Sequence, residues 1–439
     1  MPHSSYTCRT AASSPEGRLC SRTVARASPS RRPACGVFGE RLQVVVDDTS
    51  MIGARVRAVR VRQGMSLDAL AAATGLSKAH LSRIERGERS LDRRSTLQTI
   101  ADALRTPVAE LTGQPFTPRN QAENTAHAAA LDVRDVLMGT ELGEYPGGTT
   151  RPPAALTRDL WRVERLIEAA DYAGFGPLLP ALLTDAHAAV AGDDRQAGVP
   201  LLVRCCFAVN ELQNGTGHHE LAWIAAERAY AAALLSEDAT LIGAANVLRG
   251  FTLMKLGLKP RERALAIVTA AAEELTRHPT TDESAEVLGM LHLIAAYAHN
   301  AAGRPGPADD RQREAVAFAE FTGDGNAFNL WFGPANVVVW QVSMAVERGE
   351  GAVVADLAAG VSSAILRPSR RAAMLMSVGR GLARERDRHQ EAVQVFLRAE
   401  ALAPQRVHAD PFVRESIGSL LSAAGGAELR GLARRAGVA

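Results

Sequence analysis

The sequence predicts an all-α protein in which a small basic helical domain precedes a larger acidic array of helices. Apolar residues recur at helical spacing in segments of roughly 14–20 residues, and Gly, Pro and Asp separate the segments. Residues 51–113 hold eleven Lys or Arg against six Asp or Glu, whereas residues 114–439 hold an excess of six acids. Basic charge gathered in a compact segment is typical of a protein that binds a polyanion.

The composition excludes several classes of protein. The chain has 439 residues, of which 46% are hydrophobic and 22% charged, as in an ordinary soluble globular protein. No apolar run reaches the ~18 residues of a membrane span. Its five cysteines form neither a disulfide framework nor a zinc-binding pattern. We therefore expect a cytoplasmic, nucleoid-associated protein without a metal, a cofactor or a membrane partner.

Residues 1–50 are rich in Ser, Arg and Pro and show no helical or strand period before residue 41. They fit a disordered tail, a targeting peptide, or translation that truly starts at Met51. Because the helical pattern begins directly after Met51, we favour the third interpretation.

Residues 51–113 predict a bundle of five short helices. Ser66 and Ser77 are good N-cap residues for the second and third helices, and Ser95 is one for a fourth helix over 97–104. Residues 107–111 supply the fifth. Three glycines are placed to end helices: Gly64, Gly75 and Gly87. The expected core residues are Val56, Val59, Leu67, Leu70, Ala71, Leu81, Ile84, Leu97, Ile100 and Leu104.

The second and third helices, joined by a tight turn at Gly75, predict a helix-turn-helix. A third helix of this kind fits the major groove of DNA and reads base edges. Residues 52–113 resemble the Xre/Cro/cI family of lambda-repressor-like domains. The matching residues are Arg57, Gly64, Ser66, Leu70, Ala71, Gly75, Ser77, Leu81, Ser82, Ile84, Glu85, Arg86, Gly87, Arg89, Leu97, Ile100, Ala101, Ala103, Leu104 and Leu111.

The resemblance implies a set of site residues. The residues that would face bases are Lys78, Ala79 and Arg83. Those that would approach phosphates are Ser66, Ser77, Ser82, Arg86, Arg89 and Arg93. It also implies an ion pair between Arg60 and Glu85. Arg83 matches the O6 and N7 atoms of guanine, with a phosphate contact as its alternative. The loop 90–92 departs from the family, in which a Pro is common there.

Residues 114–155 are rich in Pro and Gly and predict a linker, with room for one helix over 126–138. Residues 156–439 predict a helical-repeat domain, because similar helix–turn–helix units recur with turns at Gly257, Gly303, Gly349 and Arg386. These units resemble degenerate tetratricopeptide (TPR) repeats, so an α-solenoid is expected, with a non-repetitive bundle as the alternative. The run Val337–Val339 suits a short strand or a buried helix.

Other residues give weaker signals. No nucleotide-binding or hydrolase motif is present, so we expect no enzymatic activity. Cys205 and Cys206 fit buried inert thiols better than a redox switch. His218, His219 and Glu220 fit a helix start, and His292 and His299 fit core or surface positions better than a groove. The aromatic residues of segment 326–340 form either a packed core or a ligand-facing patch.

The chain layout resembles actinobacterial regulators. It therefore predicts a sequence-specific transcriptional regulator, a homodimer on an inverted repeat of double-stranded DNA. Its helical repeats would sense a peptide, a small molecule or a protein. The alternative is a TPR-like interaction scaffold with a vestigial helix-turn-helix.

Overall fold

In the computed structural model, which describes residues 51–144, 151–278, 280–361, 366–423 and 425–438, every regular element is a helix. The predictions for residues 1–50 lie outside the described residues. The N-terminal unit consists of α1 (Ile52–Arg62), α2 (Leu67–Thr74), α3 (Lys78–Glu85), α4 (Arg94–Ala103) and α5 (Val108–Thr112). We call the helices that follow the helical array.

The helical array begins with α6 (Gln121–Gly139), α7 (Pro153–Glu168), α8 (Tyr172–Phe175), α9 (Leu179–Ala191), α10 (Arg195–Gly215), α11 (His219–Ala233), α12 (Ala239–Leu256) and α13 (Leu258–Leu275). It continues with α14 (Asp282–Ala301), α15 (Pro305–Thr322), α16 (Pro334–Arg348), α17 (Val354–Ala359), α18 (Pro368–Leu382), α19 (His389–Leu402), α20 (Pro404–Ala409), α21 (Pro411–Ala423) and α22 (Ala427–Ala436). Short 3₁₀ turns lie at Gly176–Leu178, Ala327–Asn329, Gly351–Val353 and Arg386–Arg388.

Local sequence explains the helices of the N-terminal unit. The Ser66 hydroxyl accepts a hydrogen bond from the backbone N–H of Ala69, and the Ser77 hydroxyl accepts one from that of His80. Gly75 adopts the left-handed conformation that ends α2, with φ of 69°. The prediction for α4 was wrong at its start. This helix begins at Arg94, so Ser95 lies inside it and Arg93 occupies the capping position without a side-chain cap.

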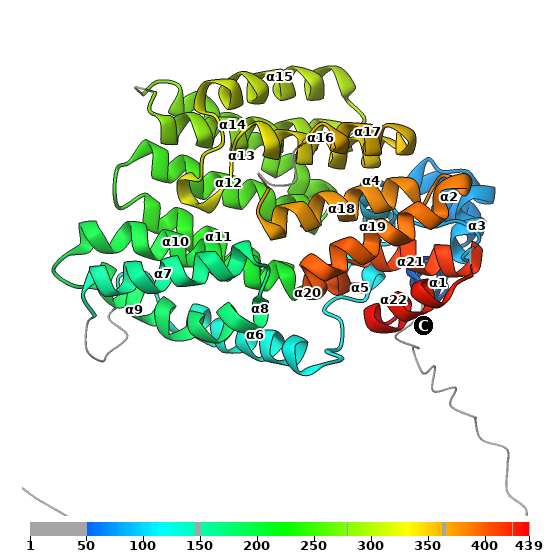
Figure 1. Cartoon of the computed structure of the whole chain (residues 1–439), viewed down its shortest axis with the longest axis horizontal. Coiled ribbons are helices and arrows are strands. Elements are labelled where there is room, and N and C mark those ends of the chain that lie inside the picture. Colours follow the sequence, from blue (N-terminus) through cyan, green and yellow to red (C-terminus); the bar gives the residue numbers. More distant parts are fainter. Residues whose placement is uncertain (1–50, 145–150, 279, 362–365, 424, 439) are drawn as a thin grey trace, which may run out of the picture. The chain divides into compact units, whose positions relative to one another are not determined.

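Consecutive helices of the array pack in pairs, which Figure 1 shows from green to orange. The pairs are α10–α11, α12–α13, α14–α15 and α18–α19. The turns predicted at Gly257 and Gly303 lie between paired helices and have φ of 144° and 69°. Arg386 begins the 3₁₀ turn between α18 and α19, whereas Gly349, with φ of 86°, ends α16 and precedes α17, outside these pairs. Val337–Val339 belongs to α16 and is helical.

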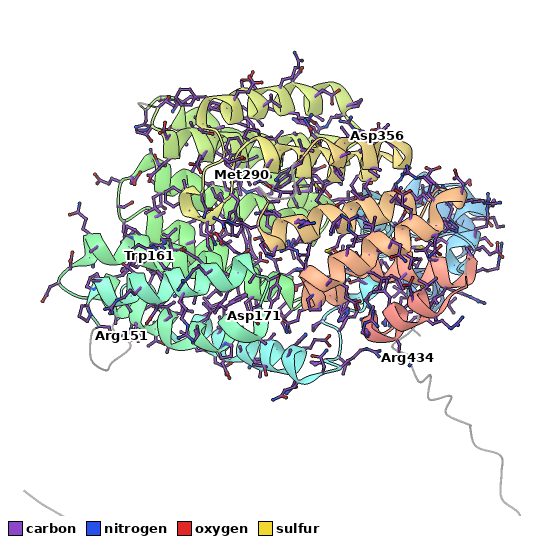
Figure 2. The ribbon with its side chains drawn as sticks, in the orientation of Figure 1. Arg151, Trp161, Asp171, Met290, Asp356 and Arg434 are labelled. Carbon is purple, nitrogen blue, oxygen red and sulfur yellow. The ribbon has the colours of Figure 1, made fainter. Side chains whose placement is uncertain are left out.

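Small residues allow the paired helices to approach closely. A Cβ atom at Gly250 would lie 2.4 Å from a methyl of Val268, and one at Gly379 would lie 2.6 Å from the ring of Phe396. Met290 of α14 is buried among the helices, whereas Trp161 of α7 stands at the surface with 57% of its area exposed (Figure 2). The large cores are rich in Ala, Leu and Val.

The predicted linker 114–155 contains a helix that belongs to the array. Asn120 caps α6 by accepting a hydrogen bond from the N–H of Glu123. The helix packs against α9 and α8 through Ala126, Ala129, Ala130, Val133 and Leu137. The array therefore starts at α6, because apolar residues at helical spacing bury one face of this segment. No helix among the described residues is long and apolar enough to cross a membrane.

Candidate nucleic-acid interface

Helix α3 combines one buried face with one exposed face. Leu81 and Ile84 are buried in the core of the N-terminal unit, with 0% and 1% of their area exposed. Lys78, Ala79 and Arg83, predicted to face bases, are all exposed. These three residues lie on the exposed face of α3, which is the face that a recognition helix turns toward base edges in the major groove. Their contacts with DNA stay a prediction.

The ion pair implied for Arg60 and Glu85 is present. The Arg60 guanidinium donates to both carboxylate oxygens of Glu85, at 2.6 and 2.7 Å, and to the carbonyl of Met65 at 2.7 Å. The pKa of Arg60 is raised, chiefly by its hydrogen bond to Glu85. This pair joins α1 to the C-terminal turn of α3, while Gly53 lets the backbones cross, because a Cβ there would lie 1.9 Å from the Ile84 carbonyl oxygen.

The residues predicted to contact phosphates differ in their present partners. The oxygens of Ser66 and Ser77 accept the cap bonds, so their hydroxyl hydrogens stay available to donate to a phosphate. Arg86 pairs with Glu88 at 2.5 and 2.8 Å and also contacts the Ser82 hydroxyl. Arg89 is exposed.

Arg93 differs from these residues because its guanidinium lies against α16 of the array. A Cβ added at Gly349 would lie 1.8 Å from an Arg93 nitrogen. A phosphate contact would therefore require this side chain to leave the array.

The cationic residues around α3 create a positive potential. The pKa of His80 is lowered, first by burial and then by the charges of Arg89, Arg83 and Arg93. An anion approaching this face meets several guanidinium groups at once, which favours a polyphosphate backbone.

The opposite face of the N-terminal unit is docked on the helical array, which sequence reasoning did not foresee. The Glu415 carboxylate in α21 accepts hydrogen bonds from the backbone N–H groups of Ile52 and Leu91, each at 3.0 Å. Asp92 contacts Arg384, and its carbonyl accepts from Arg380 at 2.5 Å. The loop 90–92, which departs from the family pattern, is thus a contact with the array.

Helix α4 makes further contacts with the array. The backbone N–H of Arg94 donates to Glu347 at 2.8 Å, and the Gln98 amide donates to the Met254 carbonyl at 2.9 Å. Phe412, in the first turn of α21, is buried in the same apolar cluster as the core of the N-terminal unit. All described residues accordingly belong to one compact unit.

The weaker sequence signals have structural explanations. Cys205 and Cys206 are fully buried, and burial raises the pKa of both thiols, that of Cys206 to about 12. His292 is buried and stacks on Phe318. His219 begins α11, as expected of a helix start, and it has further contacts. Its Nδ1 lies 3.0 Å from the side-chain Oδ1 of Asn214, and its ring lines a cavity described below.

The aromatic segment divides between core and cavity. Phe332 is fully buried against Gly289, whereas Trp340 lines the cavity. Within the described part of the chain, no group of three His, Cys, Asp or Glu is placed to hold a metal ion.

Comparison with known proteins agrees with this geometry. Residues 52–112 match a family model described as a helix-turn-helix domain. These residues form a helix-turn-helix domain. No curated protein matches the chain. The matched range coincides with α1–α5, so we call this unit the helix-turn-helix domain, and its presence indicates a DNA-binding protein.

Proposed function

We propose that this protein is a sequence-specific transcriptional regulator of the Xre/Cro/cI type, which binds an inverted repeat of double-stranded DNA as a homodimer in the cytoplasm. One observation carries the proposal: α3 exposes Lys78 and Arg83 to solvent while Glu85, on the same helix, is buried in its pair with Arg60. Because guanidinium groups pair with guanine through two hydrogen bonds, Arg83 is the principal base reader.

In this proposal the helical array consists of TPR-like repeats that sense an effector, and the protein has no catalytic activity. The paired helices with glycine turns support the repeat interpretation. The contacts of the array with α4 and with the loop 90–92 support a regulatory role, because an effector that moves the array would also act on the helix-turn-helix domain.

The test begins with genome-wide footprinting of the tagged full-length protein, followed by electrophoretic shifts on the recovered site. Arg83→Ala should remove specific binding, a loss of at least ~10-fold, while far-ultraviolet circular dichroism stays unchanged. Arg313→Ala, which removes an exposed arginine of α15, is the matched control and should bind as the wild type does. Equal binding of the site by Arg83→Ala would refute the assignment of α3.

Salt dependence separates this function from an interaction scaffold. The affinity for DNA should fall steeply between about 50 and 200 mM salt, because phosphate contacts release counterions. A chain that binds no DNA sequence even at low salt would instead be a scaffold with a vestigial helix-turn-helix.

A further inference from the structure

A cavity of about 230 Å³ lies where the helix-turn-helix domain meets the helical array. Arg94 and Gln98 of α4 and Gln114, which follows α5, form one wall. Residues of α8, α10, α11, α12, α14, α16, α18, α20 and α21 line the remainder. The helix-turn-helix domain and the helical array therefore both line this cavity. A regulator needs these two parts to be coupled.

The lining of this cavity carries more cations than carboxylates. The cations are Arg94, Lys255, Arg370, Arg380 and Arg406, and the carboxylates are Glu211 and Asp410. Glu347 adds a third carboxylate from just outside the lining.

Three of the cations have carboxylate partners. Arg94 lies 3.4 Å from Asp410, Arg380 lies 3.1 Å from Glu347, and Arg406 lies 3.2 Å from Glu211.

The other two cations, Lys255 and Arg370, have no carboxylate partner among the described residues. The Lys255 ammonium faces the ring of Phe251, 4.7 Å from its centroid, and the Arg370 guanidinium faces the ring of Trp331 at 4.8 Å. The Arg370 Nε atom is buried without a hydrogen-bond partner. Both side chains are partly buried at the cavity wall, and withdrawing a charge from water without a counter-ion is costly, so an anion in the cavity would be favourable.

Burial favours the neutral form of both groups. Burial lowers the pKa of Lys255 to about 7, although the charge of Glu211 acts to raise it. Burial likewise lowers the pKa of Arg370 to about 10, with the charge of Arg406 acting in the same direction. Lys255 and Arg370 line the same cavity, together with Glu211 and Arg406, whose charges act on both groups.

Apolar side chains line the rest of the cavity, including Phe251, Met254, Trp340, Met376 and Phe412. A ligand that fits must therefore join a charged group to an apolar body. We propose that this cavity binds a small organic anion, with an aromatic or aliphatic body, whose carboxylate or phosphate group is held by Lys255 and Arg370.

This inference names the class of effector and rests on the proposed function only for its regulatory consequence. A ligand in the cavity touches α4 and the array together, so its occupancy changes the free energy of their docking. By linkage, DNA bound to α3 and an anion bound in the cavity alter each other's affinity by the same factor.

The test measures the thermal stability of the full chain without DNA, in the presence of matched probes. The probes are benzoate and benzamide, octanoate and octanamide, phenyl phosphate and phenol, and inorganic phosphate alone. We expect at least one organic anion to raise Tm by several degrees, as a ligand bound only to the native state does, and its neutral partner to leave Tm unchanged. A larger Tm shift with phenyl phosphate than with benzoate would identify the charged group of the ligand as a phosphate ester. A larger shift with benzoate would identify it as a carboxylate. Inorganic phosphate, which lacks an apolar body, should shift Tm less than either.

Two variants make the test specific. Lys255→Met and Arg370→Met should lose the response to the anion, whereas Lys259→Met, which removes an exposed lysine at the start of α13, should keep it. Without any probe and at pH 6, below the pKa of Lys255, Lys255→Met should raise Tm, because it removes a partly buried cation that has no carboxylate partner. This second readout does not depend on the choice of probes.

The inference is overturned if no anion shifts Tm more than its neutral partner, if Lys255→Met responds as the wild type does, or if Lys255→Met lowers the Tm without probes. Since none of these measurements involves DNA, such a result leaves the proposed function intact. Loss of DNA binding would be seen separately, through Arg83.

Discussion

The guanidinium of Arg94, in the helix-turn-helix domain, stacks on the ring of Phe412, in the helical array, with its central carbon 4.4 Å from the ring centroid. Phe412 has 3% of its area exposed and packs in the cluster that includes Leu97 and Ile100 of α4. The array thus supplies one side chain of the core of the helix-turn-helix domain. The domain is docked through its own apolar interior as well as through polar contacts.

Phe412→Ala should therefore destabilise the protein by about 3–5 kcal/mol, the usual cost of deleting a buried aromatic ring. Chemical denaturation measures this loss, and hydrogen exchange in α4 should rise more than in α14. The matched control is Phe321→Ala, because Phe321 has 66% of its area exposed. Equal effects of the two substitutions would contradict the docking through Phe412.

The pair between Arg60 and Glu85 predicts a second stability effect. Arg60→Ala leaves the Glu85 carboxylate buried without its partner, which should cost about 3–5 kcal/mol. The exposed pair of Lys78 and Asp68 is the control, and Asp68→Ala should change stability by less than ~1 kcal/mol. The free energy of unfolding in urea distinguishes the two, and a loss below ~1 kcal/mol for Arg60→Ala would mean that the pair is not buried in solution.

His187 predicts a loss of stability in acid. Its Nε2 accepts a hydrogen bond from Arg228 at 2.9 Å, so the ring must be neutral, and burial lowers its pKa to about 4. Unfolded chains bind the proton near pH 6.5, so about 3 kcal/mol of stability is present above pH 6.5 and is lost as the pH falls to about 4.

His187→Gln keeps an acceptor for Arg228 and cannot be protonated, so its unfolding free energy should fall less than that of the wild type between pH 7.5 and 4. The exposed His278→Gln should leave the wild-type profile unchanged. Parallel profiles of the wild type and His187→Gln would show that this histidine does not titrate as described.

Glu415 predicts a pH effect of the opposite sign. Burial raises the pKa of its carboxyl to about 7, against the lowering effect of the hydrogen bonds from Leu91 and Ile52. The folded protein therefore holds this proton more tightly than the unfolded chain does, and stability falls by about 3 kcal/mol as the pH rises from 4.5 to 7.

Glu415→Gln removes this titration and replaces one acceptor by an amide N–H₂ group that faces a backbone donor. The variant should be less stable than the wild type at pH 4.5, and the difference should shrink or reverse at pH 8. Thermal unfolding at both pH values tests this expectation, which a constant difference would contradict.

The sequence predicted the helix-turn-helix domain well because its signals are local. Ser66, Ser77 and Gly75 act within one helical turn of their own positions, and the apolar residues of α1–α4 lie at helical spacing. The misplaced start of α4 has a local cause too, because Ser95 is a good cap by type but Arg94 already has helical geometry.

The docking surface could not be predicted in the same way. Glu415 and Ile52 are 363 residues apart in the chain, and no periodic pattern links them. The helix predicted over 126–138 lies within α6 (Gln121–Gly139). Its start was missed, although Asn120 with Glu123 is a helix-start signal, because the prolines and glycines around it favoured a linker. The cavity between α4 and α12 depends on both parts being in place, so its lining residues were recognisable only from the structure.

The docking of α4 on the array has a consequence for the operator. A helix-turn-helix domain on a flexible linker can bind half-sites at several separations, because the linker adapts to each distance. A helix-turn-helix domain fixed to the array cannot, so a homodimer on an inverted repeat, as we propose, would accept half-sites at one separation and one angular phase along the duplex. Five added base pairs between the half-sites place one of them on the opposite side of the DNA duplex. A helix-turn-helix domain with a fixed position would then no longer bind that half-site.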